Sequence, residues 1–265
     1  MLETVLEVIA EVKDRIRHAD RISLFLDFDG TLVPIEADPQ SPRLDPATMD
    51  TLQTLSNQES LLTTIISGRA IEDLYARIRL KGLIYAGNHG REIFGRNLRF
   101  VEPAAFARQK QLELLCDEIR TKLRPVDGVL VEFKGLTASV HYRRATKSCR
   151  AEIEAAVRAA VACSGGGLHM NPGRKVFEIV PGTGWHKGEA VRWINNRLGE
   201  HHTLTIYLGD DISDEYAFSL LQDAITVKVG STRVTCAKYR LPDPPAVHEF
   251  LLWLAIQKTL RQSRA

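Results

Sequence analysis

Residues 25–34 read FLDFDGTLVP, and the fold prediction starts from this stretch. The mostly apolar residues from Ile22 to Leu26 predict a buried strand, and two carboxylates, Asp27 and Asp29, follow it. Like charges this close repel each other, and carboxylates at the end of an apolar strand lose hydration. A compensating partner is therefore needed, and other segments of the chain offer candidates for it.

The composition is that of a soluble globular protein. The chain has 265 residues, enough for one large domain or two smaller ones. Hydrophobic residues make up 44% and charged residues 26%, which is ordinary for this class. The net charge is only +2, which argues against a general surface for nucleic acid or another polyanion.

Cysteine spacing and the apolar segments indicate the compartment. The four cysteines form no Cys-x-x-Cys pair, which favours free thiols in a reducing environment over a zinc site. The first 20 residues are amphipathic and lack the cationic start and apolar core of a signal peptide. The late apolar run at 250–256 is too short to span a bilayer. We therefore expect a cytoplasmic protein that binds neither membranes nor nucleic acid.

Alternating helix and strand patterns predict an α/β fold. The strands are almost continuously apolar, which favours a parallel sheet covered on both faces. The expected elements are a helix at 2–18, a strand at 22–27, a helix at 46–56, a strand ending at 67, a helix from about 70 and a strand at 83–87. After an interruption come a helix at 186–198, a strand at 204–209, a helix at 214–222, a strand at 225–229 and a helix at 246–261.

The interruption has a different pattern. A helix at 103–123 precedes strands at 129–133 and 136–143, and a helix at 146–162 and a strand at 175–180 follow. The strand at 136–143 alternates apolar and polar residues, which predicts an antiparallel sheet with one free face. We predict a Rossmann-like parallel-sheet core of residues 1–99 and 183–265, with an inserted α+β domain of residues 100–182.

Polar residues stand where the parallel strands are expected to end, and ligands bind beyond that edge of such sheets. The second strand leads into Ser67, Gly68 and Arg69, and the late strand leads into GDDISDE (209–215). Lys187 stands at the start of the helix that follows the insert. Clustered carboxylates favour a hard cation such as Mg²⁺, and Ser67 and Lys187 would complete a phosphate site.

These parts predict phosphoryl transfer. One Asp attacks phosphorus to form an aspartyl-phosphate, and the other protonates the leaving oxygen and then activates water. Each segment alone also has a structural explanation: a turn at 27–31, helix caps at 67–69 and 209–215, and a surface lysine at 187. Their occurrence together, each at a strand end or helix start, favours the functional interpretation.

At these residues the sequence resembles the haloacid dehalogenase superfamily, whose four signature elements match DFDGT (27–31), Ser67, Lys187 and GDDISDE (209–215). The resemblance implies Asp27 as nucleophile, Asp29 as general acid/base, and an insert that is a cap domain of the second class. It implies Mg²⁺ ligands at Asp27, the backbone carbonyl of Asp29, and Asp210, with support from Asp211 or Asp214. It implies phosphate-binding residues Asp27, Gly30, Thr31, Ser67, Gly68 and Lys187.

Within that superfamily the chain is similar, over nearly its whole length, to the trehalose-6-phosphate phosphatase family. The similarity lies in ISGR (66–69), GNHGREI (87–93), VEFKGLTASVHYR (131–143) and GRKVFEIVPGTGWHKG (173–188). It implies trehalose biosynthesis, a sugar-phosphate substrate, and functional coupling to a trehalose-6-phosphate synthase. It implies substrate contacts by Arg69, Asn88, His89, Glu132, Lys134, His141, Arg143, Lys175 and Glu178.

Other functions fit parts of the pattern. The same core would serve sucrose phosphate, glucosyl- or mannosyl-3-phosphoglycerate, or a hexose phosphate, although the cap segments favour trehalose 6-phosphate. An inactive regulatory domain would lack an Asp in the first motif, where both Asp27 and Asp29 are present. A dehalogenase would not need Asp29, and the order of the motifs argues against a signalling receiver domain.

Overall fold

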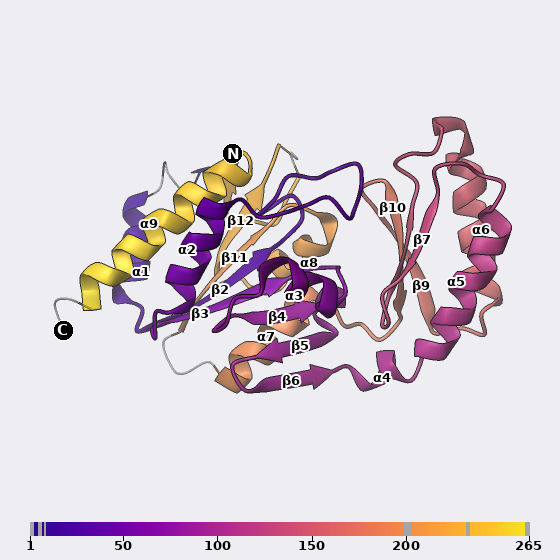
Figure 1. The fold of residues 1–265 in the computed structure, drawn as a ribbon. Helices are drawn as coiled ribbons and strands as arrows, with labels where there is room; N and C mark the ends of the chain where they lie inside the picture. The colour runs from indigo at the N-terminus through magenta and orange to yellow at the C-terminus, as the bar shows by residue number, and fades with distance from the viewer. Residues whose placement is uncertain (1–2, 5–6, 8, 199–202, 232–233, 263–265) are drawn as a thin grey trace. The chain divides into compact units, whose positions relative to one another are not determined.

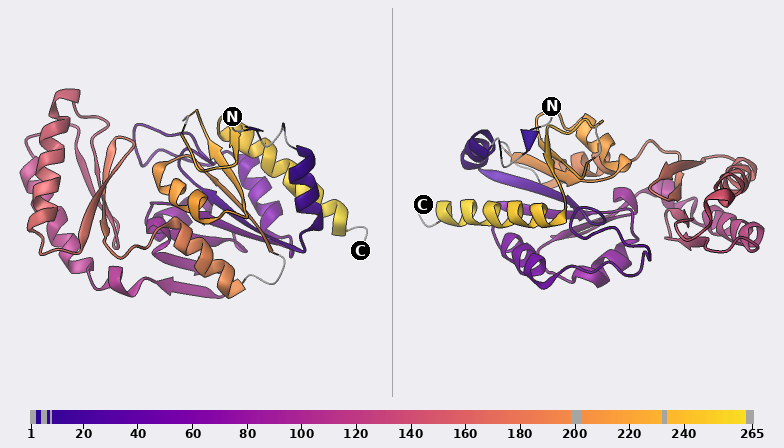
Figure 2. Two further views of the ribbon diagram at one scale, coloured as in Figure 1. Left: turned by 180° about the vertical axis from the view of Figure 1, so that it is seen from behind. Right: turned by 90° about the horizontal axis from the view of Figure 1, so that it is seen from above.

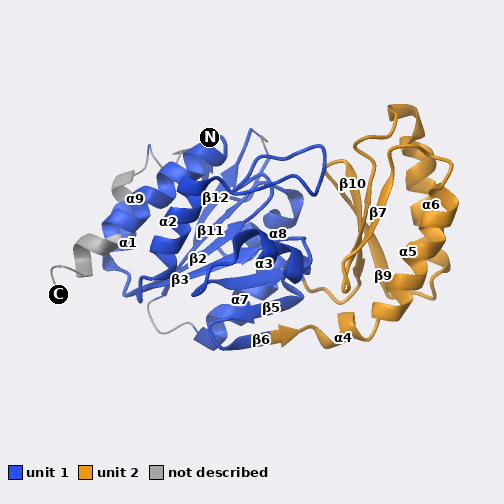
Figure 3. Cartoon of the chain, viewed as in Figure 1, with its two compact units in different colours: residues 1–99, 186–265 blue, residues 100–185 orange. Residues whose placement is uncertain are grey.

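The structure is a computed structural model that describes residues 3–4, 7, 9–198, 203–231 and 234–262. The chain forms two compact units (Figure 3). Unit 1 consists of residues 1–99 and 186–265, and unit 2 of residues 100–185. The sequence placed the end of the insert at 182, whereas unit 2 extends to Trp185. The assignment of the units as catalytic core and cap stays a prediction.

Unit 1 is built on a large, mostly parallel sheet (Figure 1). Its strands are β1 (Glu3–Thr4), β2 (Arg21–Asp27), β3 (Leu61–Ile66), β4 (Ile84–Gly87), β5 (Glu92–Gly95), β6 (Leu98–Val101), β11 (Thr203–Gly209), β12 (Ile225–Val229) and β13 (Tyr239–Leu241). Their order across the sheet is β1-β13-β12-β11-β2-β3-β4-β5-β6. All neighbours from β1 to β4 are parallel, and β4 pairs antiparallel with β5. The predicted α/β fold class with a parallel-sheet core is confirmed.

Helices cover both faces of this sheet (Figure 2). They are α1 (Ile9–His18), α2 (Pro46–Ser56), α3 (Ile71–Ile78), α7 (Lys187–Leu198), α8 (Ile212–Leu220) and α9 (Pro244–Gln262). The steps β2–α2–β3 and β11–α8–β12 run in opposite directions across the sheet. Because parallel crossovers are right-handed, α2 and α8 lie on opposite faces. The central strands are therefore buried on both sides, and their polar residues stand at their ends.

Unit 2 is a four-stranded antiparallel sheet with two long helices packed on one face. Its elements are α4 (Pro103–Phe106), α5 (Gln109–Leu123), β7 (Leu130–Phe133), β8 (Ala138–His141), α6 (Arg150–Cys163), β9 (Leu168–Gly173) and β10 (Val176–Pro181). The strand order is β7-β8-β10-β9. Leu115 and Ile119 of α5 and Val157 of α6 share a core with Val140 and Phe177 of the sheet. The other face of β7, β8 and β10 carries polar side chains, as the alternation in the sequence predicts.

Several predicted elements differ from the observed ones. The helix expected at 2–18 begins at Ile9, because Glu3–Thr4 pairs with β13 through backbone bonds that the side-chain pattern does not report. The helix expected at 103–123 is two helices, α4 and α5, and Arg108 between them has φ −100° and ψ 1°. The short strands β5, β6, β9 and β13 were not predicted. β9 contains Asn-Pro-Gly, a sequence more typical of a turn.

Among the described residues, no helix combines the length and apolar character needed to cross a lipid bilayer.

Candidate active site

Lys187 lies in the first turn of α7 and supplies a positive charge to the buried carboxylates, including Asp27 at the end of β2. Its Nζ is 2.6 Å from Asp27 Oδ1 and 2.7 Å from Asp214 Oδ1. The Lys187 side chain is 2% exposed, and both carboxylates are buried as well. Since an unpaired buried charge is very costly, the three groups stabilise one another at the carboxyl edge of the sheet.

Asp210 adds a third carboxylate to this group. It follows β11 directly, and its ligand oxygen and those of Asp27 and Asp214 all lie within 4.8 Å of one another. Burial, together with the charges of Asp214 and Asp211, raises the pKa of Asp210 to about 7. Burial also raises the pKa of Asp27 well above its usual range, although Lys187 opposes this. The site thus holds more negative charge than Lys187 alone neutralises, and its carboxylate oxygens are the ligands that Mg²⁺ prefers.

Asp214 is the most firmly held of these carboxylates. Besides Lys187, it accepts hydrogen bonds from the Tyr207 hydroxyl at 2.7 Å and the Asp211 N–H at 2.9 Å. Burial acts to raise the pKa of Asp214, but Lys187 and these donors outweigh it and the pKa is lowered. Of the two residues that the sequence left open, the structure therefore groups Asp214, and not Asp211, with Asp27 and Asp210.

Two buried side chains at this edge were missed by sequence reasoning. Tyr207 lies in β11, is fully buried and stacks on Phe25 of β2. In the sequence it is one aromatic residue of an apolar strand, and such a residue is expected in the core. Lys228 is the next-to-last residue of β12 (ITVKV), and its Nζ is 3.1 Å from Glu215 Oε1 and 3.4 Å from the Asp211 carbonyl oxygen. A lysine in an otherwise apolar strand could have been recognised as a signal.

The glycines of the two acidic motifs allow those motifs to pack closely. Gly30 has φ +86°, and a Cβ there would lie 2.2 Å from Asp210 Oδ2. A Cβ at Gly209 would lie 2.3 Å from Asp214 Cγ. Any side chain at either position would displace a carboxylate. Thr31, which follows Gly30, is fully buried, and its predicted contact with phosphate stays a prediction.

Asp29 has a different partner from Asp27. Both of its oxygens accept hydrogen bonds from Arg69, from Nε at 2.7 Å and from Nη2 at 2.7 Å. The Arg69 guanidinium also lies over the Phe28 ring, 5.5 Å from its centroid, and bonds Asp73 in α3. In this structure Arg69, which was predicted to contact substrate, thus holds the predicted acid/base.

A left-handed turn brings Asn88 and His89 beside the end of β3. Asn88, His89 and Gly90 have φ values of 48°, 59° and 81°. The Asn88 N–H donates to the Arg69 carbonyl at 2.7 Å, and the His89 N–H donates to the Ser67 carbonyl at 2.8 Å. Consecutive positive φ values are strained for residues with side chains, and such strain is concentrated at functional sites. The turn joins the predicted phosphate and substrate segments of unit 1.

In unit 2, Ser139 lies between two carboxylates on the polar face of the sheet. The strand register places it opposite Glu132 of β7 and opposite Glu178 of β10. Its hydroxyl is 2.8 and 2.9 Å from the two Glu178 oxygens. Lys134 Nζ lies 3.5 Å from Glu178 Oε2, and His141 Nε2 lies 2.9 Å from Glu132 Oε2. Sequence reasoning placed Ser139 on the polar half of the strand but did not choose it as a site residue.

Basic side chains on this face offset part of the negative charge of the two glutamates. Burial acts to raise the pKa of Glu132, but His141 and Lys134 outweigh it and the pKa is lowered. The two remaining predicted residues lie at the end of the sheet, near the turn between β9 and β10. Arg143 donates to the Arg174 carbonyl at 2.9 Å, and Lys175 is exposed at φ 66°. Of the residues predicted in unit 2, Lys134 and Glu178 form one charged pair and His141 and Glu132 form another.

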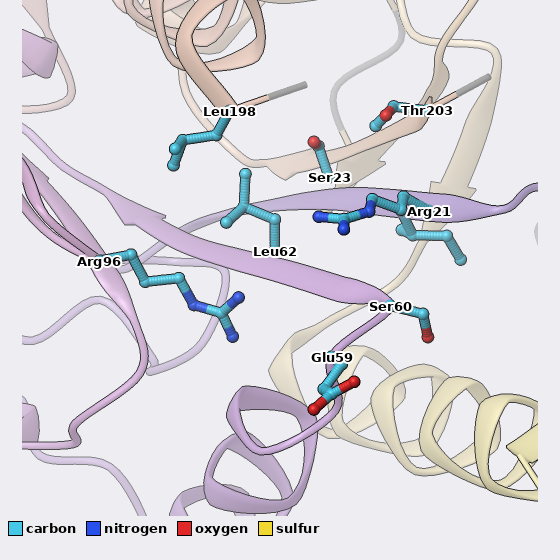
Figure 4. A pocket seen from close by; sticks show the side chains of 9 residues that line it. Arg21, Ser23, Glu59, Ser60, Leu62, Arg96, Leu198 and Thr203 are labelled. Carbon is cyan, nitrogen blue, oxygen red and sulfur yellow. The ribbon is translucent and has the colours of Figure 1, made fainter. Parts of the chain in front are cut away.

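A separate cavity of about 160 Å³ opens at the other end of the unit 1 strands (Figure 4). Arg21 and Ser23 at the start of β2 line it, with Leu62 of β3 and Thr203 of β11. Asp27 ends the strand that Arg21 begins, so the length of β2 separates this cavity from the carboxylates.

Comparison with known proteins gives a consistent result. The chain matches the family model described as trehalose-phosphatase over residues 25–245. The trehalose-phosphate phosphatase of Mycobacterium tuberculosis is 36% identical over 244 residues, which cover 89% of this chain and 61% of that protein. The chain thus spans less than two thirds of the length of this curated relative.

Two solved structures share the fold. The C. albicans trehalose-6-phosphate phosphatase C-terminal domain has a TM-score of 0.82 at 21% identity, covering 96% of this chain and 98% of that one. A trehalose-6-phosphate phosphatase related protein has a TM-score of 0.80 at 22% identity, covering 90% of this chain and 99% of that one.

Proposed function

The chain belongs to the trehalose-phosphatase family, and from this membership we propose that it is a Mg²⁺-dependent phosphatase that hydrolyses trehalose 6-phosphate to trehalose and phosphate. The observation that carries the proposal is the buried group of Asp27, Lys187 and Asp214, with Asp210 beside it, at the carboxyl edge of the sheet. A structural ion pair needs one carboxylate for one ammonium. Here three carboxylates, those of Asp27, Asp210 and Asp214, lie around the single ammonium of Lys187. Such an excess of carboxylates suits a site that binds a cation and a phosphoryl group.

The residues fit a magnesium ion. Asp27, Asp210 and Asp214 would hold it, because their oxygens lie together. The pKa of Asp210 is raised by burial and by its negative neighbours, and a bound cation would offset the effect of those neighbours. The backbone carbonyl of Asp29 and the side chain of Asp211 stay predicted ligands from the resemblance. When bound, the ion stabilises negative charge on the transferring phosphoryl group.

Asp27 is the proposed nucleophile. Its carboxylate oxygen forms a bond to phosphorus, and the bond between phosphorus and the 6-oxygen of the sugar breaks, which leaves an aspartyl-phosphate. Lys187, 2.6 Å from Asp27, stabilises negative charge on this carboxylate and on the phosphoryl oxygens. Ser67, Gly68, Gly30 and Thr31 are the further proposed phosphate contacts.

Asp29 is the proposed acid and base. It donates a proton to the departing sugar oxygen, and its carboxylate then takes a proton from the water that attacks phosphorus. The second attack breaks the bond between Asp27 and phosphorus, releases phosphate and restores the Asp27 carboxylate. Asp29 is less buried than Asp27, with a side chain 35% exposed against 6%, which suits a group that exchanges protons with water.

The polar face of unit 2 is the proposed site of sugar selection. Charged groups that bond hydroxyls directionally are suited to a disaccharide. Glu178 is the centre of this face, because it contacts both Ser139 and Lys134. The other proposed contacts from the resemblance are Glu132, His141, Arg143 and Lys175 in unit 2, and Arg69, Asn88 and His89 in unit 1.

Phosphate release from a matched panel of substrates tests the proposal. The panel is trehalose 6-phosphate, sucrose 6-phosphate, glucose 6-phosphate, glucosyl-3-phosphoglycerate and mannosyl-3-phosphoglycerate, each with Mg²⁺ and with EDTA. We expect a strong preference for trehalose 6-phosphate that EDTA abolishes. Metal-dependent activity on another member would overturn the substrate and keep the chemistry. No activity on any member would overturn the enzymatic proposal in favour of a regulatory domain.

A cytoplasmic location and functional coupling to a trehalose-6-phosphate synthase complete the proposal. The free cysteines are compatible with a reducing compartment. Co-purification of the native protein with the synthase would support the coupling, and its absence at physiological concentrations would argue against it.

A further inference from the structure

Arg69 joins two carboxylates from different parts of unit 1. Through Nε and Nη2 it bonds both oxygens of Asp29, which follows β2. Through Nη1 it bonds Asp73 Oδ2 at 2.8 Å, in the first turn of α3. The guanidinium is a rigid planar fork, so fixing one edge of it fixes the direction of the other.

Asp73 is itself held in place by a second arginine. Arg77, one turn further along α3, donates from Nε to both Asp73 oxygens at 2.9 and 3.1 Å. Nη1 of Arg77 also donates to the Pro42 carbonyl at 2.6 Å. Asp73 therefore occupies a defined position between two cations. The Arg69 side chain is only 11% exposed, so its orientation depends on these partners.

We propose that Asp73 is a positioning residue for the phosphatase reaction: it orients Arg69, and Arg69 directs the carboxylate of Asp29. The inference rests on the proposed function, in which Asp29 transfers the proton to the leaving group. Proton transfer requires a donor at hydrogen-bond distance and in line with its acceptor, so small misplacements lower the rate strongly. Within the described part of unit 1, the side chains that donate hydrogen bonds to the Asp73 carboxylate are those of Arg69 and Arg77.

The test compares leaving groups of different basicity. 4-Nitrophenolate leaves from phosphorus with little need of a proton, whereas phenolate and a sugar alkoxide need one. We expect Asp73→Asn to lower kcat/KM roughly tenfold for phenyl phosphate and for the preferred sugar phosphate, and less than about twofold for 4-nitrophenyl phosphate. Asp73→Glu, which keeps the charge, should restore part of the loss.

Glu72→Gln is the matched control. Glu72 is the neighbouring acidic residue in the same first turn of α3 and is exposed. Its loss removes the same charge from the same helix end but leaves the fork intact. We expect kcat/KM on every substrate to match the wild type, and circular dichroism should show the same fold for both variants.

A double-mutant cycle tests whether Asp73 acts through Arg69. If it does, Asp73→Asn should cause no further loss in an Arg69→Gln background, on aryl or sugar phosphate. An equal loss on all leaving groups, or the same loss in both backgrounds, would overturn the inference while the proposed function stood. A wild-type protein inactive on every substrate would instead overturn the proposed function, and the inference with it.

Discussion

The two units gather charged side chains in different ways. At the carboxyl edge of unit 1, Lys187 and Asp214 have side chains 2% and 0% exposed. On the sheet face of unit 2, His141 and Glu132 are 23% and 30% exposed. Buried charges interact strongly and cannot exchange partners with water, whereas partly exposed ones can. Under the proposed function, the buried group of unit 1 would supply fixed electrostatics for the chemistry. The face of unit 2 combines the largely buried Lys134–Glu178 pair, 6% and 17% exposed, with the partly exposed His141–Glu132 pair, whose contacts could exchange with hydroxyls.

Removal of the proposed nucleophile should give the largest effect and affect every substrate equally. Asp27→Asn keeps the shape of the side chain but removes the attacking oxygen anion. We expect kcat to fall at least about 10³-fold on sugar and aryl phosphates alike. Phosphate release measures this, with circular dichroism as the control for folding. An active Asp27→Asn variant would contradict the assignment of chemistry to this edge.

The excess of carboxylates at the carboxyl edge of unit 1 predicts a pH-dependent stability opposite in sign to that of Glu132 in unit 2, whose pKa is lowered. In the folded protein, burial and the neighbouring carboxylates raise the pKa of Asp210 from about 3.9, its ordinary value, to about 7. Between these values the folded state binds the extra proton, so this contribution to stability is full at low pH and is lost as pH rises through about 7. Without divalent cations, Asp210→Asn should be more stable than the wild type at pH 8, by on the order of 2 kcal/mol, and not at pH 4.

Urea unfolding in EDTA at the two pH values measures this difference. Added Mg²⁺ at pH 8 should raise the free energy of unfolding of the wild type more than that of Asp210→Asn, because the ligand is missing in the variant. Equal free energies of unfolding of both proteins at all pH values would argue against electrostatic repulsion between Asp210 and the neighbouring carboxylates.

Tyr207→Phe tests whether the hydrogen bond to Asp214 matters for activity in unit 1. The change removes the hydroxyl that donates to Asp214 and keeps the ring that stacks on Phe25. We expect kcat to fall roughly tenfold, since a hydrogen bond to a buried charge is lost and Asp214 shifts against Lys187. The control is Tyr85→Phe: Tyr85 lies in β4 of the same sheet, and its hydroxyl donates to the Leu80 carbonyl oxygen in the loop between α3 and β4. That variant should lose stability and keep kcat; equal effects of both changes on kcat would refute a specific role of Tyr207.

Ser139→Ala should give the smallest effect, and on binding alone. Glu178 would lose the hydroxyl that bonds both of its oxygens. We expect KM for the preferred sugar phosphate to rise roughly fivefold, with kcat on 4-nitrophenyl phosphate unchanged. Ser164→Ala, which removes a hydroxyl bonded to the Val161 backbone, is the matched control in unit 2. Losses of equal size on both substrates would argue against sugar selection by this face.

The parts that could be predicted from sequence are those that local patterns encode. Apolar strands that end in Asp27, Ser67 and Asp210 predicted where polar groups meet, because parallel strands share one edge. The alternation at 136–143 predicted the polar face of unit 2. The pairing of Arg69 with Asp29 could not be predicted, because the two residues lie 40 positions apart and no local pattern connects them. The bond from Tyr207 to Asp214 spans only seven residues, but it joins a strand to the following helix and has no regular spacing that would reveal it. The i,i+4 spacing of Arg69 and Asp73, in contrast, is a local signal that could have been recognised. The strand β9 was missed because Asn-Pro-Gly is more typical of turns.

In the proposed reaction Asp27 carries the phosphoryl group, and this intermediate can be trapped and located. Wild-type protein would be mixed with Mg²⁺ and its preferred substrate, quenched in acid within milliseconds, and digested for mass spectrometry. The account predicts one phosphoryl group on the peptide that contains FLDFDGTLVP, located at Asp27 and absent from Asp27→Asn. A phosphoryl group on another residue, or turnover by direct attack of water with no phosphorylated peptide at any time, would contradict it.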